Sequence, residues 1–209
     1  MTNEAPQIPE RNLSSSKGEA ILRGGMQEFL KNGYAATSMD RVAKAAQVSK
    51  ATVYSHFQDK EGLFIAIIKY LVEEKFQTIF EPIGTDNFAT EPEIILKELA
   101  NRMLDTASEE LVFQNFMRVI IGESGRFPQL ARAFVTNVEA TGFRVLRDYF
   151  THCPRFNFAD PEAIARIFVG SIVHFLIVQE MLHGKDIVPM ERDRLIDSLI
   201  ALIVPDKKM

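Results

Sequence analysis

The sequence predicts an all-α protein, and three observations support this fold class. Apolar residues recur at three- and four-residue spacing along most of the chain, as they do in amphipathic helices. Prolines stand at positions 128, 161 and 189, where helices are expected to begin, because the first helical turn does not use the missing N–H. The sequence lacks the apolar–polar alternation of strands between hairpin turns. We expect about nine helices.

The composition is that of a globular protein from a reducing compartment. Of the 209 residues, 46% are hydrophobic and 25% are charged, so the chain can bury a core without cross-links. Cys153 is the single cysteine, and no intrachain disulfide can form. The first thirty residues lack the apolar region of a signal peptide, and the longest apolar stretch, residues 167–178, is shorter than a membrane span. We therefore expect a cytoplasmic protein without a membrane partner.

Short helices are predicted near the N-terminus. Gly33 is a stop signal for the first helix. Thr37 and Asp40 form a T-x-x-D capping box before a short second helix. Ser49 is an N-cap candidate for a third short helix, and Asp59 opens a longer fourth one.

The predicted organisation has an N-terminal helix-turn-helix three-helix domain and a larger C-terminal helical bundle. The predicted boundaries are 1–13 for a disordered arm, 14–60 for the helix-turn-helix domain, 61–80 for a connecting helix and 81–209 for the C-terminal domain. The helices expected in the C-terminal domain are about 93–107, 109–121, 128–150, 161–182 and 189–204.

Residues 37–60 have the layout of a helix-turn-helix motif, which is two short helices joined by a turn of three to four residues. Ala43 is the small residue at the helix crossing, while Lys50, Thr52 and Ser55 lie on the outer faces of the second helix. These side chains are hydrogen-bond donors of the kind that the major groove and its phosphates accept. Residues 11–60 carry eight Lys/Arg against four Asp/Glu, a net charge of +4, whereas the remaining residues carry −8.

Residues 17–70 resemble the DNA-binding domain of the TetR family of transcriptional regulators. The resemblance includes apolar, small, capping and aromatic positions in one register. They are Phe29, Gly33-Tyr34, Thr37-Ser38, Val48-Ser49-Lys50, Val53-Tyr54, His56-Phe57 and Lys60-Glu61. In the second half of the chain, Arg118, Glu123 and Arg126-Phe127-Pro128 are similar to the C-terminal domain of AefR-like members.

The resemblance implies that Ser49 to His56 form the recognition helix of a DNA-binding site. It places Lys50 and Thr52 nearest to base edges, and Phe57 inward. The residues that it implies for DNA contact are Thr37, Ser38, Ser49, Lys50, Ala51, Thr52, Tyr54, His56 and Lys60. For His56, a solvated position without a role in DNA binding is an equally weighted alternative.

The sequence departs from the family pattern at two places. Gln47 stands where family members usually have Gly in the turn, and a left-handed backbone at a non-Gly residue costs about 1 kcal/mol. We therefore expect a turn that is either slightly strained or differently shaped. Gly24-Gly25 replaces a pair of small Ala residues in the first helix, at a cost of about 1 kcal/mol each. We expect close packing against a neighbouring helix to explain these glycines, with local mobility as the alternative.

No metal site, catalytic site or cofactor is expected. His152 and Cys153 are adjacent, and His174 and His183 are isolated, so none has the spacing of zinc ligands. Residues 122–125 lack the strand and the five-residue spacing of a G-x-S-x-G turn. No Gly-rich nucleotide-binding motif occurs.

The C-terminal domain is rich in Phe and Met, which are suited either to an ordinary helical core or to an adaptable apolar cavity. The resemblance favours the cavity and thus a small apolar effector, with Arg118 and His174 orienting a polar group of the ligand. The residues expected to line it are Met103, Phe113, Phe116, Met117, Arg118, Phe143, His174 and Phe175.

The last two predicted helices, 161–182 and 189–204, are apolar over more than one face. Such helices must be buried, either centrally or against a second chain. With the family resemblance, this favours a homodimer formed through both helices. Two recognition helices about 34 Å apart would then read a palindromic operator in double-stranded DNA.

Together these observations favour a sequence-specific DNA-binding transcriptional regulator, a repressor that a small apolar effector releases. One alternative is a helical small-molecule-binding protein or enzyme with a vestigial DNA-binding module. Another is a module that uses the N-terminal helices to bind protein.

Overall fold

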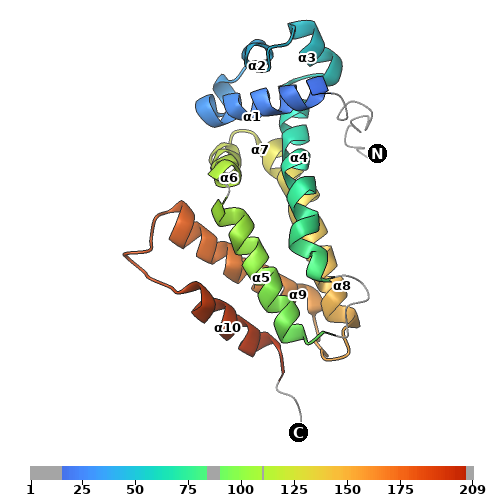
Figure 1. Cartoon of the computed structure of the whole chain (residues 1–209), viewed down its shortest axis with the longest axis vertical. Helices are drawn as coiled ribbons and strands as arrows, with labels where there is room; N and C mark the ends of the chain where they lie inside the picture. Colours follow the sequence, from blue (N-terminus) through green and yellow to red (C-terminus); the bar gives the residue numbers. More distant parts are fainter. Residues whose placement is uncertain (1–15, 84–89, 110, 206–209) are drawn as a thin grey trace. The chain divides into compact units, whose positions relative to one another are not determined.

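The computed structural model describes residues 16–83, 90–109 and 111–205, and within these ranges the chain is all-α (Figure 1). The predicted fold class is therefore confirmed, while the predicted arm at 1–13 lies outside the described residues. The chain divides into two compact units. Of the described residues, the N-terminal unit comprises 16–72 and 115–137, and the C-terminal unit comprises those between 73 and 114 and between 138 and 205.

The N-terminal unit contains three helices of a helix-turn-helix domain and the start of a fourth. These are α1 (Ser16–Ala36), α2 (Met39–Ala45), α3 (Lys50–His56) and α4 (Lys60–Phe80). α1 packs against α2, and α2 packs against α3 (Figure 1). As predicted, Gly33 interrupts α1, since its backbone has φ 74° and ψ 172°. Glycine adopts this conformation without the steric penalty of a Cβ atom.

The glycine pair in α1 lies where two other helices approach closely, which confirms the packing explanation. A Cβ atom at Gly24 would lie 2.8 Å from the backbone nitrogen of Ala46, at the end of α2. A Cβ atom at Gly25 would lie 3.0 Å from a methyl carbon of Leu63 and 3.1 Å from one of Ile67, both in α4. Backbone is close to Gly24 and flexible side chains are close to Gly25, so Gly24 is the more restricted position.

Aromatic side chains join the N-terminal helices to α6 (Leu111–Glu123) and α7 (Pro128–Phe134). The ring of Phe64 in α4 stacks on Phe116 in α6, with 4.7 Å between ring centroids. Tyr34 makes edge contacts with Phe64 at 5.3 Å and with Phe127, which precedes α7, at 4.8 Å. The N-terminal unit therefore includes residues 115–137, which the sequence analysis assigned to the C-terminal domain.

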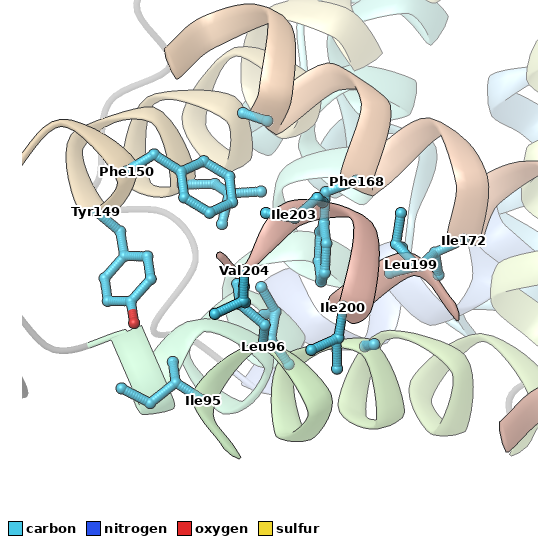
Figure 2. Packing of buried hydrophobic residues seen from close by; sticks show 14 of the residues in the cluster. Ile95, Leu96, Tyr149, Phe150, Phe168, Ile172, Leu199, Ile200, Ile203 and Val204 are labelled. Carbon is cyan, nitrogen blue, oxygen red and sulfur yellow. The ribbon is translucent and has the colours of Figure 1, made fainter. Parts of the chain in front are cut away.

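The C-terminal unit is built from α5 (Pro92–Glu109), α8 (Ala140–His152), α9 (Pro161–Phe175) and α10 (Arg192–Ile203), preceded by a short 3₁₀ turn at Glu81–Ile83. Apolar side chains from all four α-helices point toward one another and form one core (Figure 2). Fully buried members include Leu96, Phe150, Phe168 and Ile196. Burial of this core holds the four helices together.

The observed helices agree with the predicted ones except at two π turns and one start. The predicted helices 128–150 and 161–182 contain π-helical turns at Val135–Glu139 and Leu176–Met181. Prolines 128 and 161 occupy first helical turns, as predicted. α10 begins at residue 192, after an N-cap at Glu191, so the predicted start at Pro189 is wrong by three residues.

The helix from Pro161 to Met181 has 21 residues and a mean hydropathy of 1.6, so by length and composition alone it could cross a membrane. The apolar stretch of residues 167–178 is by itself shorter than a membrane span, but the helix that contains it is longer. In the structure, only 28% of its most apolar window is buried. One face packs in the C-terminal core through Phe168, Ile172 and Phe175, while Ile167 lies exposed on another face.

The substitution Gly24→Ala should lower the free energy of unfolding by about 1–3 kcal/mol, because the added methyl group meets the backbone of α2. The control is Gly122→Ala in α6, where no atom of the described residues beyond the adjacent backbone of the helix lies within 4 Å of the added carbon. This control should leave stability unchanged or raise it by up to about 1 kcal/mol. Urea unfolding followed by circular dichroism measures both. Equal stability of Gly24→Ala and the wild type would contradict the close approach.

Candidate DNA-binding site

The second helix of the motif is capped by Ser38, whose Oγ accepts a hydrogen bond of 3.4 Å from the backbone N–H of Arg41. The predicted capping box of Thr37 and Asp40 is therefore wrong. Thr37 is buried, and its hydroxyl lies 2.8 Å from the Gly33 carbonyl and 3.0 Å from another carbonyl of α1. The hydroxyl hydrogen is thus used inside the domain. This corrects the phosphate contact that the resemblance implies for Thr37.

The turn between α2 and α3 contains a left-handed residue, which is the strained one of the two expected alternatives. Gln47 has φ 56°, a region that favours glycine. The backbone N–H of Val48 donates to the Ala43 carbonyl at 3.0 Å and closes the turn. This turn sets the direction in which α3 leaves α2.

The third helix is amphipathic and begins at a side-chain cap. The Oγ of Ser49 accepts a hydrogen bond of 3.1 Å from the backbone N–H of Thr52 and lies 2.8 Å from the Thr52 hydroxyl. Val53 is fully buried, and Phe57, which follows the helix, is buried as predicted. These two residues anchor one face. The exposed face carries four side chains, namely Lys50, Ala51, Tyr54 and Ser55.

Lys50, the first residue of α3, has two defined neighbours. Its Nζ lies 2.7 Å from a carboxylate oxygen of Asp40 in α2 and 5.8 Å from the centre of the Tyr54 ring. The hydrogen bond and the charge of Asp40 raise the pKa of Lys50. Lys50 and Asp40 are both exposed, so solvent and a polyanion have access to this ion pair. Asp40, predicted to be part of a cap, is instead the partner of Lys50.

Lys60, at the start of α4, binds the end of α1. Its Nζ donates to the carbonyls of Tyr34 at 2.8 Å and Ala35 at 3.2 Å, and it lies 4.4 Å from the centre of the Tyr34 ring. Partial burial lowers the pKa of Lys60, and the charge of Glu123 opposes this shift. Burial also raises the pKa of Tyr34 to about 12. Lys60 therefore neutralises the carbonyl end of α1, whatever contact it makes with DNA.

The other predicted DNA-contact residues lie on or beside the same surface. Ser38 is exposed at the start of α2, and Thr52 and His56 are partly exposed in α3. Arg41 and Lys44, which the sequence analysis did not single out, are exposed on α2. Their basic character at outward helical positions is the signal that could have identified them.

The residues predicted to line a ligand cavity are divided between the two units. Phe116, Met117 and Arg118 belong to the N-terminal unit. Met103, Phe113, Phe143, His174 and Phe175 belong to the C-terminal unit. Phe175 is buried in the core of the C-terminal unit, and Met103 and Phe143 are packed against that core. His174 is exposed. Within a unit, the structure brings together only part of the predicted set.

A helix-turn-helix domain with a capped, outward-facing third helix defines a class of DNA-binding proteins. Residues 21–67 match the family of bacterial regulatory proteins called the tetR family, and residues 95–204 match the C-terminal domain of AefR-like transcriptional repressors. The chain belongs to the TetR family of helix-turn-helix transcriptional regulators.

Individual relatives are similar over different lengths. The solved structure of the flavonoid-responsive regulator FrrA has 30% sequence identity and a TM-score of 0.72, and the match covers 88% of this chain and 92% of FrrA. The transcriptional regulator AcuR of Cereibacter sphaeroides is 26% identical over 80% of this chain and 82% of its own. The uncharacterised regulator YhgD of Bacillus subtilis is 37% identical over 92 residues, which are 44% of each chain. These relatives are transcriptional regulators.

The substitution Gln47→Gly should raise the free energy of unfolding by up to about 1 kcal/mol, because glycine relieves the left-handed strain at this turn. The greater freedom of glycine in the unfolded chain offsets part of the gain. Gln47→Ala is the matched control, since alanine retains the strain. Thermal unfolding should rank the Gln47→Gly variant above the Gln47→Ala variant by about 1 kcal/mol, and the reverse order would contradict the predicted strain.

Proposed function

We propose that the protein is a cytoplasmic repressor that binds a palindromic operator as a homodimer and is released by a small apolar effector. The observation that carries the proposal is the outer face of α3, where Lys50, Ala51 and Tyr54 are exposed while Val53 anchors the helix. A helix held in this way can enter the major groove without unfolding any part of the domain.

The proposed DNA contacts fall into two groups. Lys50 and Thr52 are proposed to face base edges, with Ala51 allowing close approach. Ser38, Ser49, Tyr54 and His56 are proposed to contact the phosphate backbone. Lys60 is proposed to bind a phosphate together with the backbone N–H groups at the start of α4. Phosphate contacts set the register, whereas base contacts determine the sequence.

The proposed dimer forms through the helices 161–182 and 189–204. Ile167, Gly170 and His174 are exposed on α9 at spacings of three and four residues, so they lie on one helical face. On α10, 85% of Leu202 is exposed. Little of this apolar helix is buried within its own chain, which favours a protein partner. A second copy related by two-fold symmetry supplies the second recognition helix that a palindrome requires.

The proposed effector binds among the aromatic and Met side chains beyond the helix-turn-helix domain. FrrA, a relative named as flavonoid-responsive, supports an apolar ligand of small size. Within the N-terminal unit, α6 reaches α4 through the stacked rings of Phe64 and Phe116 and reaches α1 through Glu123. A ligand that displaces α6 would therefore move the helices that orient α3. The proposed dimer has two shapes, which differ in the separation of the two recognition helices. A ligand that binds more tightly to the shape whose separation does not match the operator lowers operator affinity.

Selection of bound sequences from random double-stranded 40-mers tests the DNA-binding proposal, at low and at near-physiological salt. We expect enrichment of a palindrome with half-sites about one helical turn apart. Failure to enrich any sequence at either salt would overturn the proposal. The recovered operator then serves as the probe for effectors that release the protein.

The substitutions Lys50→Ala and Tyr54→Ala should each weaken operator binding by roughly tenfold or more, because each removes a base or phosphate contact. Lys97→Ala is the control. Lys97 is an exposed lysine of α5, paired with Asp197 at 2.7 Å in the C-terminal unit. Fluorescence anisotropy with labelled operator measures the three affinities. Equal loss in Lys50→Ala and Lys97→Ala would indicate an effect of net charge rather than a contact of α3.

The substitution Ile167→Glu should raise the dimer dissociation constant by at least about tenfold, because it places a carboxylate in the proposed apolar interface. Ile94→Glu is the matched control, since Ile94 on α5 is 58% exposed and Ile167 is 54% exposed. Sedimentation velocity should give a monomer for Ile167→Glu and a dimer for Ile94→Glu. A dimer in both cases would exclude this face of α9.

A further inference from the structure

An acidic residue of α2, Asp40, is paired with Lys50, the lysine of the recognition helix. Between residues 37 and 58, Asp40 is the single carboxylate, in a segment that also carries Arg41, Lys44 and Lys50. A carboxylate close to a DNA-binding surface repels phosphate, so its presence there has an electrostatic cost for every DNA sequence. In the first turn of α2 the carboxylate is favourable toward the positive end of the helix dipole, and its contacts show a second role.

Asp40 takes no part in the side-chain cap of α2 or in the core. The cap of α2 is the hydroxyl of Ser38, and 64% of the Asp40 side chain is exposed. The contact that the structure gives Asp40 is with Lys50, at 2.7 Å. This ion pair connects two helices, unlike the i,i+4 pairs on α1 and α9. The carboxylate therefore acts on the side chain proposed to face the bases.

We infer that Asp40 is a specificity-determining residue, whose carboxylate holds the Lys50 ammonium until an acceptor on the operator replaces it. This inference rests on the proposed function, because it takes Lys50 as a DNA contact. On DNA without an acceptor at the matching position, Lys50 stays paired with Asp40 and gives no phosphate contact. On the operator, a base acceptor such as guanine O6 or N7 takes the ammonium. Asp40 thus lowers non-specific affinity more than operator affinity.

The position of Lys50 is compatible with this exchange. Its side chain is exposed by 59%, and the Tyr54 ring centre lies 5.8 Å from Nζ on the same helix. The lysine can leave the carboxylate without disturbing a buried group, because neither partner is part of the core. An exposed ion pair is weak enough for such replacement.

The test compares Asp40→Asn with the wild type on the selected operator and on a scrambled duplex. Asp40→Asn should bind the scrambled duplex about three- to fivefold more tightly at low salt, as expected for the loss of a weak surface pair. Its salt dependence on that duplex should steepen by about one counterion. Operator affinity should rise less, so the ratio of specific to non-specific affinity falls.

Two controls distinguish this inference from an effect of charge. Asp197→Asn removes a carboxylate from a pair of the same length, 2.7 Å, in the C-terminal unit, and should leave the affinity ratio unchanged. In a Lys50→Ala background, Asp40→Asn should no longer change the ratio, since Asp40 acts through Lys50.

An unchanged or increased ratio in Asp40→Asn, or an effect that persists in the Lys50→Ala background, would overturn the inference. If the wild type enriches no sequence at all, the proposed function fails first, and the inference fails with it. If the wild type selects an operator and Asp40→Asn retains full specificity, only the inference fails. Circular dichroism of each variant verifies that the helices are intact.

Discussion

The close approach of α1 and α2 at Gly24 is the constraint on which the DNA-binding surface depends. A Cβ atom at this position would lie 2.8 Å from the backbone nitrogen of Ala46, which ends α2. Ala46 is followed directly by the left-handed turn at Gln47, and that turn directs α3. A shift of α2 against α1 would therefore be transmitted along the chain to Lys50 and its neighbours. Backbone packing at one glycine thus sets the geometry of a surface on another helix.

Polar side chains in the helix-turn-helix domain are divided between holding the helices and facing outward. Thr37 and Lys60 bind the carbonyl groups of Gly33 and Tyr34 at the end of α1. The last carbonyls of a helix have no donor within the helix, so side chains can bind them. Lys50 and Tyr54 have no such internal task and remain on the surface. The outward face is consequently narrower than the set of residues that the family resemblance implies.

The aromatic cluster around Phe64 is a second contact that holds the helices of the N-terminal unit together, after the contact of α1 with α2. Phe29, Tyr34 and Phe116 all contact this ring, with centroid distances between 4.7 and 5.3 Å. Large rings in edge and stacked contacts resist small displacements, because each has a few favourable orientations. The cluster therefore connects α6 to α1 and α4 as a stiff contact, and a movement of α6 would be passed to the DNA-binding helices.

The sequence by itself determined the all-α class, the helix-turn-helix segment and the cap at Ser49, because periodicity, caps and turn residues are local signals. Only the tertiary structure decided that Thr37 faces inward, that Asp40 holds Lys50, and that residues 115–137 pack with the N-terminal helices. These contacts join elements that lie apart in the chain. Local patterns cannot specify which partner a polar or aromatic side chain meets, since packing of whole helices brings the partners together.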